Sequence, residues 1–278
     1  MSEGGGSVER VDDAWDGQGY RERPSRFGRA VVWTRTVTAL DAGMPVLPDG
    51  CIDLLWVGGR LVIAGPDSAA HHPEVAVGTR YVGMRFFPGT APALLGVPAH
   101  ELRDQRVELA DVWSSAVARR LADELADADD PVVGLERLAL RRAREVAPPD
   151  PLLRRVVAAL DNGWTVGATA EAVGLNARLL HRRSLAAFGY GPKTLARVLR
   201  LQRAVARVRD GMSFAETAAS TGYADQAHLA REVRDLTGMP LGEVLTRSSD
   251  AVPVDDQLAV GSAAYRSMPL PSGSRITA

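Results

Sequence analysis

The sequence predicts an α+β chain. An antiparallel β-sheet or barrel with a trailing helix pair comes first, and an all-α part of two helix-turn-helix units bridged by one long helix follows. Short runs of alternating and β-branched residues between turn signals indicate strands in the first part. Apolar residues at helical spacing indicate helices in the second. Within that second part, a helix-glycine-helix pattern occurs twice, at residues 165–189 and 213–238.

Length and composition divide the chain into two domains. With 278 residues, of which 46% are hydrophobic, it is long enough for two ordinary cores. We expect an irregular N-terminus at 1–27, a β-rich domain with two C-terminal helices at 28–147, a helical domain at 150–247 and a mostly disordered tail at 248–278. The N-terminus has no apolar signal core and no run approaches the ~20 apolar residues of a membrane span, which predicts a cytoplasmic protein without membrane contact.

Strand signals are concentrated in the first domain. Residues 30–40 alternate and are rich in β-branched side chains, residues 51–57 form a short apolar run, and residues 75–87 form another. Gly58 and Gly59 favour a two-residue hairpin that joins the second run to 60–64. These runs predict a small antiparallel sheet or barrel.

The pattern then changes to a helical period. One row of apolar residues is spaced four apart: Trp113, Val117, Leu121 and Leu125. Asp130 followed by Pro131 caps a second helix, and the prolines at 148–149 end it and mark the domain boundary. A small sheet need not cover the apolar faces of both helices. We therefore expect the helices at 111–126 and 131–146 to form a homodimer contact.

The repeated pattern in the second domain has the signals of a helix-turn-helix. Gly174 and Gly222 lie where the backbone must turn left-handed between two helices, which only glycine does at low cost. Thr165 and Asn176 are favourable N-caps, and Ser213 with a glutamate three residues later forms a capping box. Residues 193–210 predict a helix that joins the two units.

Each second helix of a unit presents a polar face. Arg178, His181 and Arg182 share one face, because they are three and four residues apart. In the other unit an apolar stripe faces inward and leaves four residues on the opposite side: Gln226, Ala227, Ala230 and Arg231. Residues 150–247 carry 14 basic and 9 acidic residues, whereas the rest of the chain carries 19 basic and 25 acidic. The helical domain therefore has the positive field that attracts a phosphate backbone.

At this point the chain resembles a known family. The segment LARVLRLQRAVARVRDGMSFAETAASTGYADQAHLAREVRDLTGMPLGEVL is similar to the DNA-binding domain of AraC/XylS regulators. The resemblance implies double-stranded DNA as a partner, and it implies that the seven face residues named above are base-facing positions. The sequence departs from the family pattern at Ser184, where an aromatic core residue is usual, and at Ala224, where a capping residue is usual. The second departure predicts a cap weaker by roughly 1 kcal/mol.

The first domain resembles the same family. The phrases VLPDGCIDLLW, AGPD and GMRFFPGTAPALLGVPAHEL are similar to a subgroup of AraC-like regulators whose N-terminal, cupin-like sensor domain has a poorly defined ligand. The resemblance implies a small organic effector inside the sheet or barrel and a homodimer through the helices. An aromatic-lined cavity with Asp53 or Arg85 as a polar anchor suits such an effector. Our candidate pocket residues are Trp33, Asp53, Trp56, Arg85 and Phe87, and the simpler alternative for the aromatic ones is the core.

Other chemistry is disfavoured. Adjacent His71 and His72 point to opposite faces of a strand, so we predict no metal site. The chain has no Gly-rich phosphate loop, Gly-x-Ser-x-Gly elbow or His-Glu-x-x-His motif, so we predict no catalytic residues, no cofactor and no enzyme activity. Cys51, the single cysteine, lies between two aspartates that disfavour a thiolate, which makes a buried structural cysteine the better interpretation than an alkyl or redox sensor. The remaining alternative is a ligand-free regulator whose first domain only dimerises or contacts a partner such as RNA polymerase.

Overall fold

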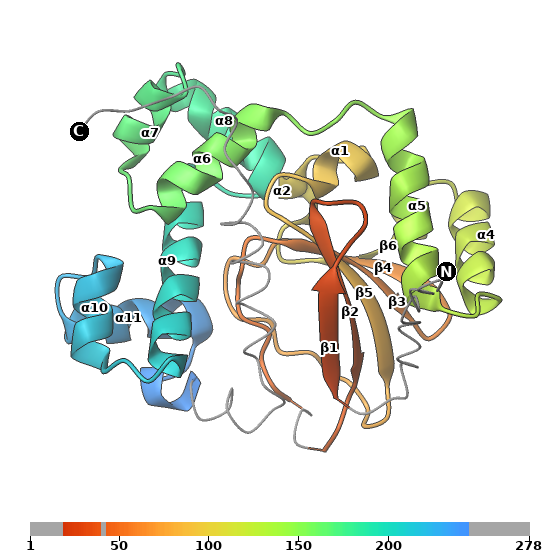
Figure 1. The fold of residues 1–278 in the computed structure, drawn as a ribbon, viewed down its shortest axis with the longest axis horizontal. Helices are drawn as coiled ribbons and strands as arrows, with labels where there is room; N and C mark the ends of the chain where they lie inside the picture. Colours follow the sequence, from red (N-terminus) through yellow and green to blue (C-terminus); the bar gives the residue numbers. More distant parts are fainter. Residues whose placement is uncertain (1–18, 40–42, 245–278) are drawn as a thin grey trace, which may run out of the picture.

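Six antiparallel strands form one sheet in the order β1-β2-β5-β3-β4-β6 (Figure 1). The structure is a computed structural model that describes residues 19–39 and 43–244, and the predicted tail at 248–278 lies outside them. The strands are β1 (Tyr20–Pro24), β2 (Ala30–Thr36), β3 (Ile52–Val57), β4 (Arg60–Ala64), β5 (Arg80–Phe86) and β6 (Arg106–Glu108). The α+β fold class is confirmed, and the described strands form a sheet rather than a closed barrel.

The hairpin prediction is confirmed. Gly58 and Gly59 have φ angles of 55° and 73° and join β3 to β4, with Val57 opposite Arg60. Two successive positive φ angles are what a type I′ turn requires, and glycine adopts them without strain. The tight turn sets the register of this strand pair.

The irregular N-terminus was predicted too long. Residues 20–24 form β1, which pairs with β2 over its whole length. Its sequence, YRERP, has no apolar alternation, because β1 is an edge strand whose side chains are half-buried or exposed. Residues 1–18 of the predicted irregular segment lie outside the described residues.

Helices α4 (Ser115–Ala126) and α5 (Pro131–Glu145) lie beside the sheet (Figure 1). Their leucines Leu121, Leu125 and Leu135 are buried in one cluster with Met84 of the sheet. The leucine rows are therefore used within the chain, and the reason given above for a homodimer through these helices does not hold. Three short helices, α1 (Ala91–Leu95), α2 (Ala99–Leu102) and α3 (Leu109–Val112), connect the sheet to the pair.

A buried ion pair attaches β1 to this helix layer. The carboxylate of Glu136 on α5 is 1% exposed and accepts two hydrogen bonds from the Arg23 guanidinium, at 3.0 and 2.9 Å. It also accepts one from the Arg26 backbone N–H at 2.8 Å. Burial alone would raise the pKa of Glu136, but these hydrogen bonds outweigh it and hold the pKa below its usual value.

Within the described residues, the second domain contains the helices α6 (Pro151–Asp161), α7 (Val166–Ala172), α8 (Ala177–Phe188), α9 (Pro192–Arg209), α10 (Phe214–Thr221) and α11 (Gln226–Thr237). The side chains of Thr165, Asn176 and Ser213 each cap a helix as predicted, and Asp150 caps α6 in the same way. Gly174 and Gly222 have φ angles of 68° and 82°, which confirms the left-handed turns in both units.

Helix α9 belongs to the cores of both units. Leu195 and Val198 near its start are buried with the first helix-turn-helix, whereas Leu201 and Val205 near its end are buried with the second. Figure 1 shows α9 running from the first unit to the second. One rigid helix therefore holds the two units at a fixed separation.

The weakened cap predicted for α11 is wrong. Asp225, one residue after Ala224, caps the helix and accepts from the His228 N–H at 2.6 Å. The Ala224 N–H in turn donates to His228 Nδ1 at 3.2 Å. Two helix-end donors are thus satisfied, and alanine at 224 does not cost a cap.

In α8, Ser184 is buried and Phe188 fills the core, while Leu185 is half-buried.

Candidate functional site

The predicted reading face of the first unit is exposed. Arg178, His181 and Arg182 all lie on the solvent side of α8, while Leu180 faces the core. His181 also lies against Gly191 at the start of α9, because a Cβ added there would be 2.9 Å from the imidazole Nε2. The start of α9 therefore limits where this imidazole can reach.

The second reading face is smaller. Gln226, Ala227 and Arg231 are exposed on α11, and Ala230 is half-buried. The inward side consists of Leu229, Val233 and Leu236, which are buried as the periodicity predicts. Figure 1 shows α11 on the second unit, at the far end of α9 from α8.

Other arginines of this domain are engaged inside it. On α9, Arg200 pairs with the buried Glu232 at 2.6 Å and Arg203 with Asp161 at 2.9 Å. Arg203 is therefore a structural link between α9 and α6 rather than a phosphate contact. Arg178, Arg182 and Arg231, by contrast, form no ion pair with any described residue. The arginines of the two predicted faces are therefore left for a partner.

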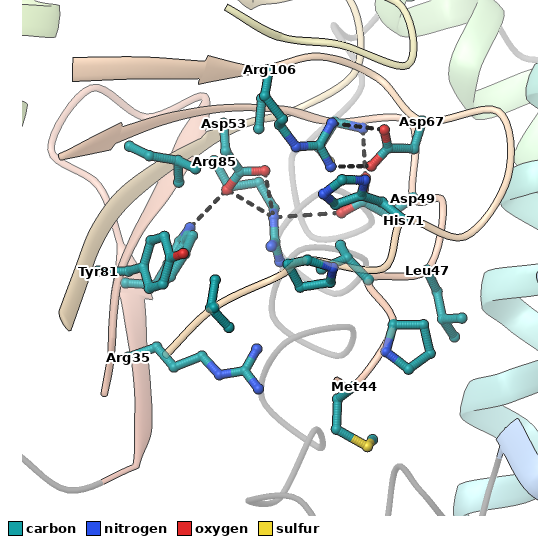
Figure 2. Close-up of a pocket in the computed structure, with 18 of the residues that line it drawn as sticks. Arg35, Met44, Leu47, Asp49, Asp53, Asp67, His71, Tyr81, Arg85 and Arg106 are labelled. Atoms are coloured by element: carbon teal, nitrogen blue, oxygen red, sulfur yellow. Dashed lines mark hydrogen bonds and ion pairs between the residues drawn. The ribbon is translucent and has the colours of Figure 1, made fainter. Parts of the chain in front are cut away.

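A cavity of about 390 Å³ lies between the sheet and two long connecting segments (Figure 2). Its walls combine aliphatic side chains with aromatic ones from β1, β2 and β5 and with a charged end. Of the five predicted pocket residues, Trp33, Asp53 and Arg85 line it. Alternation along β3 places Asp53 on the cavity face and Trp56 on the opposite face, where Trp56 packs against the core. Phe87 lies past the end of β5 and is buried outside the cavity wall, so Trp56 and Phe87, unlike the other three, do not line this cavity.

A glycine allows Trp33 to reach Asp53. The two residues are on β2 and β3, with β5 between them in the sheet. Trp33 lies over Gly83 of β5 so closely that a Cβ there would be 2.2 Å from indole Cε2. The indole N–H then donates to Asp53 Oδ1 at 2.7 Å. Trp33 also stacks between Tyr20 and Tyr81, with ring centroids 5.8 and 6.5 Å away.

Ion pairs form the charged end of the cavity. The Nε atom of Arg85 lies 3.3 Å from an oxygen of Asp53 and 3.4 Å from one of Asp49 (Figure 2). Burial raises the pKa of Asp49, although Arg85 opposes the shift. Arg106 and Asp67 form a bidentate pair at 2.9 and 2.7 Å. Sequence reasoning missed Asp49, Asp67 and Arg106 as pocket residues, because none follows a periodic pattern.

Cys51 also lines the cavity. Burial, assisted by the neighbouring Asp49, raises the pKa of its thiol well above the usual value. The sulfur is therefore a neutral thiol at physiological pH and a poor nucleophile. A neutral thiol disfavours an alkyl or redox sensor, whereas Cys51 is half-buried in the cavity wall rather than fully buried as predicted. Within residues 19–39 and 43–244, no helix has the length and apolar character needed to cross a membrane.

Known proteins match the chain at two levels. Residues 169–247 match the family described as a helix-turn-helix domain, and residues 30–108 match a domain of unknown function, DUF6597. No curated protein matches in sequence. Among solved structures, the chain is similar to ToxT from Vibrio cholerae O395, with 8% identity over 82% of this chain and 98% of that chain and a TM-score of 0.42. It is also similar to the unsaturated fatty acid-bound wild-type ToxT from Vibrio cholerae strain SCE256, with 11% identity over 84% of this chain and 99% of that chain and a TM-score of 0.43. Residues 169–247 thus form a helix-turn-helix domain, which follows a DUF6597 domain at residues 30–108.

Proposed function

We propose that this chain is a sequence-specific, DNA-binding transcription regulator whose N-terminal cavity binds a small organic effector. One observation carries the DNA-binding part. Two helix-turn-helix units on one shared helix each expose a face whose arginine side chains form no ion pair with a described residue, while Arg200 and Arg203 on α9 are paired inside the domain. A regulator of this kind acts on chromosomal DNA, so the proposal includes a cytoplasmic location.

The two faces suit major-groove recognition. Arginine can bind guanine O6 and N7 with two hydrogen bonds and glutamine can do the same with adenine, whereas alanine offers only a methyl contact to thymine. Because α9 fixes the separation of the units, we propose that α8 and α11 enter successive major grooves on one side of the duplex, ~34 Å apart. The first face carries more long polar side chains and should contribute more to specificity.

Selection of binding sites from a randomised duplex library tests the DNA-binding proposal. The full chain should enrich a site with two half-sites about one helical turn apart. Arg182→Ala should relax the preference at one base position. Arg183→Ala is the matched control, since Arg183 is the adjacent residue on α8 and pairs instead with Asp150 at 3.3 Å. Enrichment of a site confined to one groove would contradict the proposed arrangement.

The cavity supports the effector part of the proposal. Its volume of about 390 Å³ lies within the range of small-molecule sites, ~300 to 1,000 Å³. An apolar wall with a charged end suits an amphipathic molecule. A ligand that binds only the folded state raises the apparent melting temperature, and the stabilisation grows with the logarithm of the ligand concentration relative to its Kd. A thermal-shift screen of small amphipathic compounds should therefore give hits. A Val57→Trp substitution fills the cavity and should abolish the shifts that these compounds cause.

The alternative is a ligand-free regulator whose first domain only dimerises or contacts a partner such as RNA polymerase. The same screen separates the two, with Val77→Trp as the control because Val77 is exposed and outside the cavity. Compounds that shift both variants equally act elsewhere, and a screen without hits would favour the alternative.

A further inference from the structure

Two segments of the first domain lie between the cavity and most of the DNA-binding domain, although Arg209 at the end of α9 also lines the cavity. Residues 44–51 and 65–75 lie side by side, because Val46 and His71 exchange two backbone hydrogen bonds of 2.8 and 2.9 Å. We call these two segments the shared wall. Neither is part of the six-stranded sheet.

The inner side of the shared wall lines the cavity. The first segment contributes Leu47, Asp49 and Cys51 among others, and the second contributes Asp67 and His71. Asp49 also binds the charged end directly, through its 3.4 Å approach to Arg85. A molecule that enters the cavity must therefore contact the wall or displace it.

The outer side of the same wall is held by the DNA-binding domain. Gln202 on α9 donates from Nε2 to the Pro48 carbonyl oxygen at 2.6 Å, and both groups are away from the cavity lining. The Ala70 N–H donates to the Leu236 carbonyl at the end of α11, at 2.8 Å. Each wall segment is thus hydrogen-bonded to an element of the second unit.

Close packing reinforces these bonds. Gly50 lies against Tyr190 and Leu195 of the second domain, since a Cβ there would be 3.4 Å from each. Leu47 packs against the core of the second unit while it also lines the cavity, and in Figure 2 it lies on the side of the drawn helices. Tyr190 is 2% exposed, and its hydroxyl makes no hydrogen bond with a described residue. The interface therefore holds a polar group that an altered wall position could engage.

Resting on the effector cavity proposed above, we propose that the shared wall couples cavity occupancy to the position of the DNA-binding domain. Consecutive wall residues face the cavity and α9, so a displacement on one side moves the contacts on the other. Thermodynamic linkage makes the effect reciprocal. If a bound molecule strengthens or weakens the contacts between the wall and the DNA-binding domain, a change in those contacts must alter the affinity for that molecule by the same factor. Because α9 is shared by both units, the wall acts on both reading helices together.

Gln202→Leu in the full chain tests the coupling from the side remote from the cavity. It removes the donor to Pro48, and a net hydrogen bond corresponds to about a three- to tenfold change in an equilibrium constant. We expect faster amide hydrogen exchange in residues 44–51 and a change of that size in the Kd of 8-anilinonaphthalene-1-sulfonate, a dye that fluoresces in apolar cavities. Lys193→Leu, an exposed site on the same helix, is the control and should change neither.

Val57→Trp tests the reverse direction and remains informative if Gln202→Leu does not fold. It fills the cavity from the sheet side, so it should remove dye binding, change hydrogen exchange around Gln202 and alter the affinity for the selected duplex. The coupling would be overturned if Val57→Trp removes dye binding but folded Gln202→Leu changes neither hydrogen exchange nor the Kd of the dye. That result would leave the effector cavity intact. Absence of dye binding to the wild type, with no hit in the compound screen, would instead overturn the cavity itself and the coupling with it.

Discussion

Gly83→Ala should destabilise the N-terminal domain through a single side chain, the indole of Trp33. A Cβ at residue 83 would be 2.2, 2.5 and 2.6 Å from three indole atoms. The ring cannot move away freely, because Tyr20 and Tyr81 stack beside it and its N–H is bonded to Asp53. The substitution must therefore displace the indole or the strand beneath it.

The expected cost follows from these contacts. Overpacking of a buried site costs about 1 to 3 kcal/mol. A hydrogen bond to a charged group contributes about 1.5 to 3 kcal/mol, and the displaced indole would lose part of it. We expect a loss of about 2 to 4 kcal/mol in the free energy of unfolding.

Urea denaturation of the full chain measures this loss, with Gly167→Ala as the control. Gly167 is in α7, its φ is not in the left-handed region and an added Cβ would meet nothing closer than 3.9 Å. Alanine there should be neutral or stabilise the chain by up to about 1 kcal/mol. In a Trp33→Leu background the cost of Gly83→Ala should nearly vanish, because the clashing atoms are gone. An unchanged cost in that background, or a cost below about 0.5 kcal/mol in the wild type, would refute the reasoning.

Three further predictions concern charged side chains. Arg182→Ala should weaken specific DNA binding by about 1 to 3 kcal/mol; a selection experiment in which Arg231→Ala changes the preferred sequence more would reverse our ranking of the two helices. Arg203→Ala should lower the free energy of unfolding by about 2 kcal/mol through loss of its half-buried pair with Asp161, and urea denaturation that shows no change would contradict that structural role. Glu136 has a lowered pKa, so its contribution is complete above the unfolded value of about 4.3 and is lost as the pH falls through the folded value; the stability gap between wild type and Glu136→Gln should therefore be largest near neutral pH and shrink in acid, and a gap independent of pH would count against the ion pair.

The sequence by itself determined the local structure of the DNA-binding domain. Caps at Thr165, Asn176 and Ser213 and left-handed glycines at 174 and 222 are decided by groups within a few residues of one another. Helical periodicity likewise separates buried from exposed faces without any knowledge of the partner. Periodicity also predicts the exposed faces on which the seven candidate DNA-contacting residues lie; six of them are exposed and Ala230 is half-buried, and contact with DNA stays a prediction.

Periodicity does not identify an exposed or half-buried residue's partner. Arg203 and Arg182 are both arginines on helices of the same domain, yet the fold pairs only the first, with Asp161 on α6. For the same reason the number of basic residues in 150–247 overstates how many cations DNA can contact, since Arg197 and Arg200 pair with Glu232 inside the domain.

Only the tertiary structure decided the cavity. Trp33, Gly83 and Asp53 meet because β5 is inserted between β2 and β3, an order that strand signals along the chain do not specify. Asp49 and Asp67 lie in irregular segments, where no period predicts a direction for a side chain. Alternation could have excluded Trp56, since it lies an odd number of residues from Asp53 on the same strand. Local signals are decided by neighbours in sequence, whereas a cavity and its shared wall are decided by segments that meet only after the chain has folded.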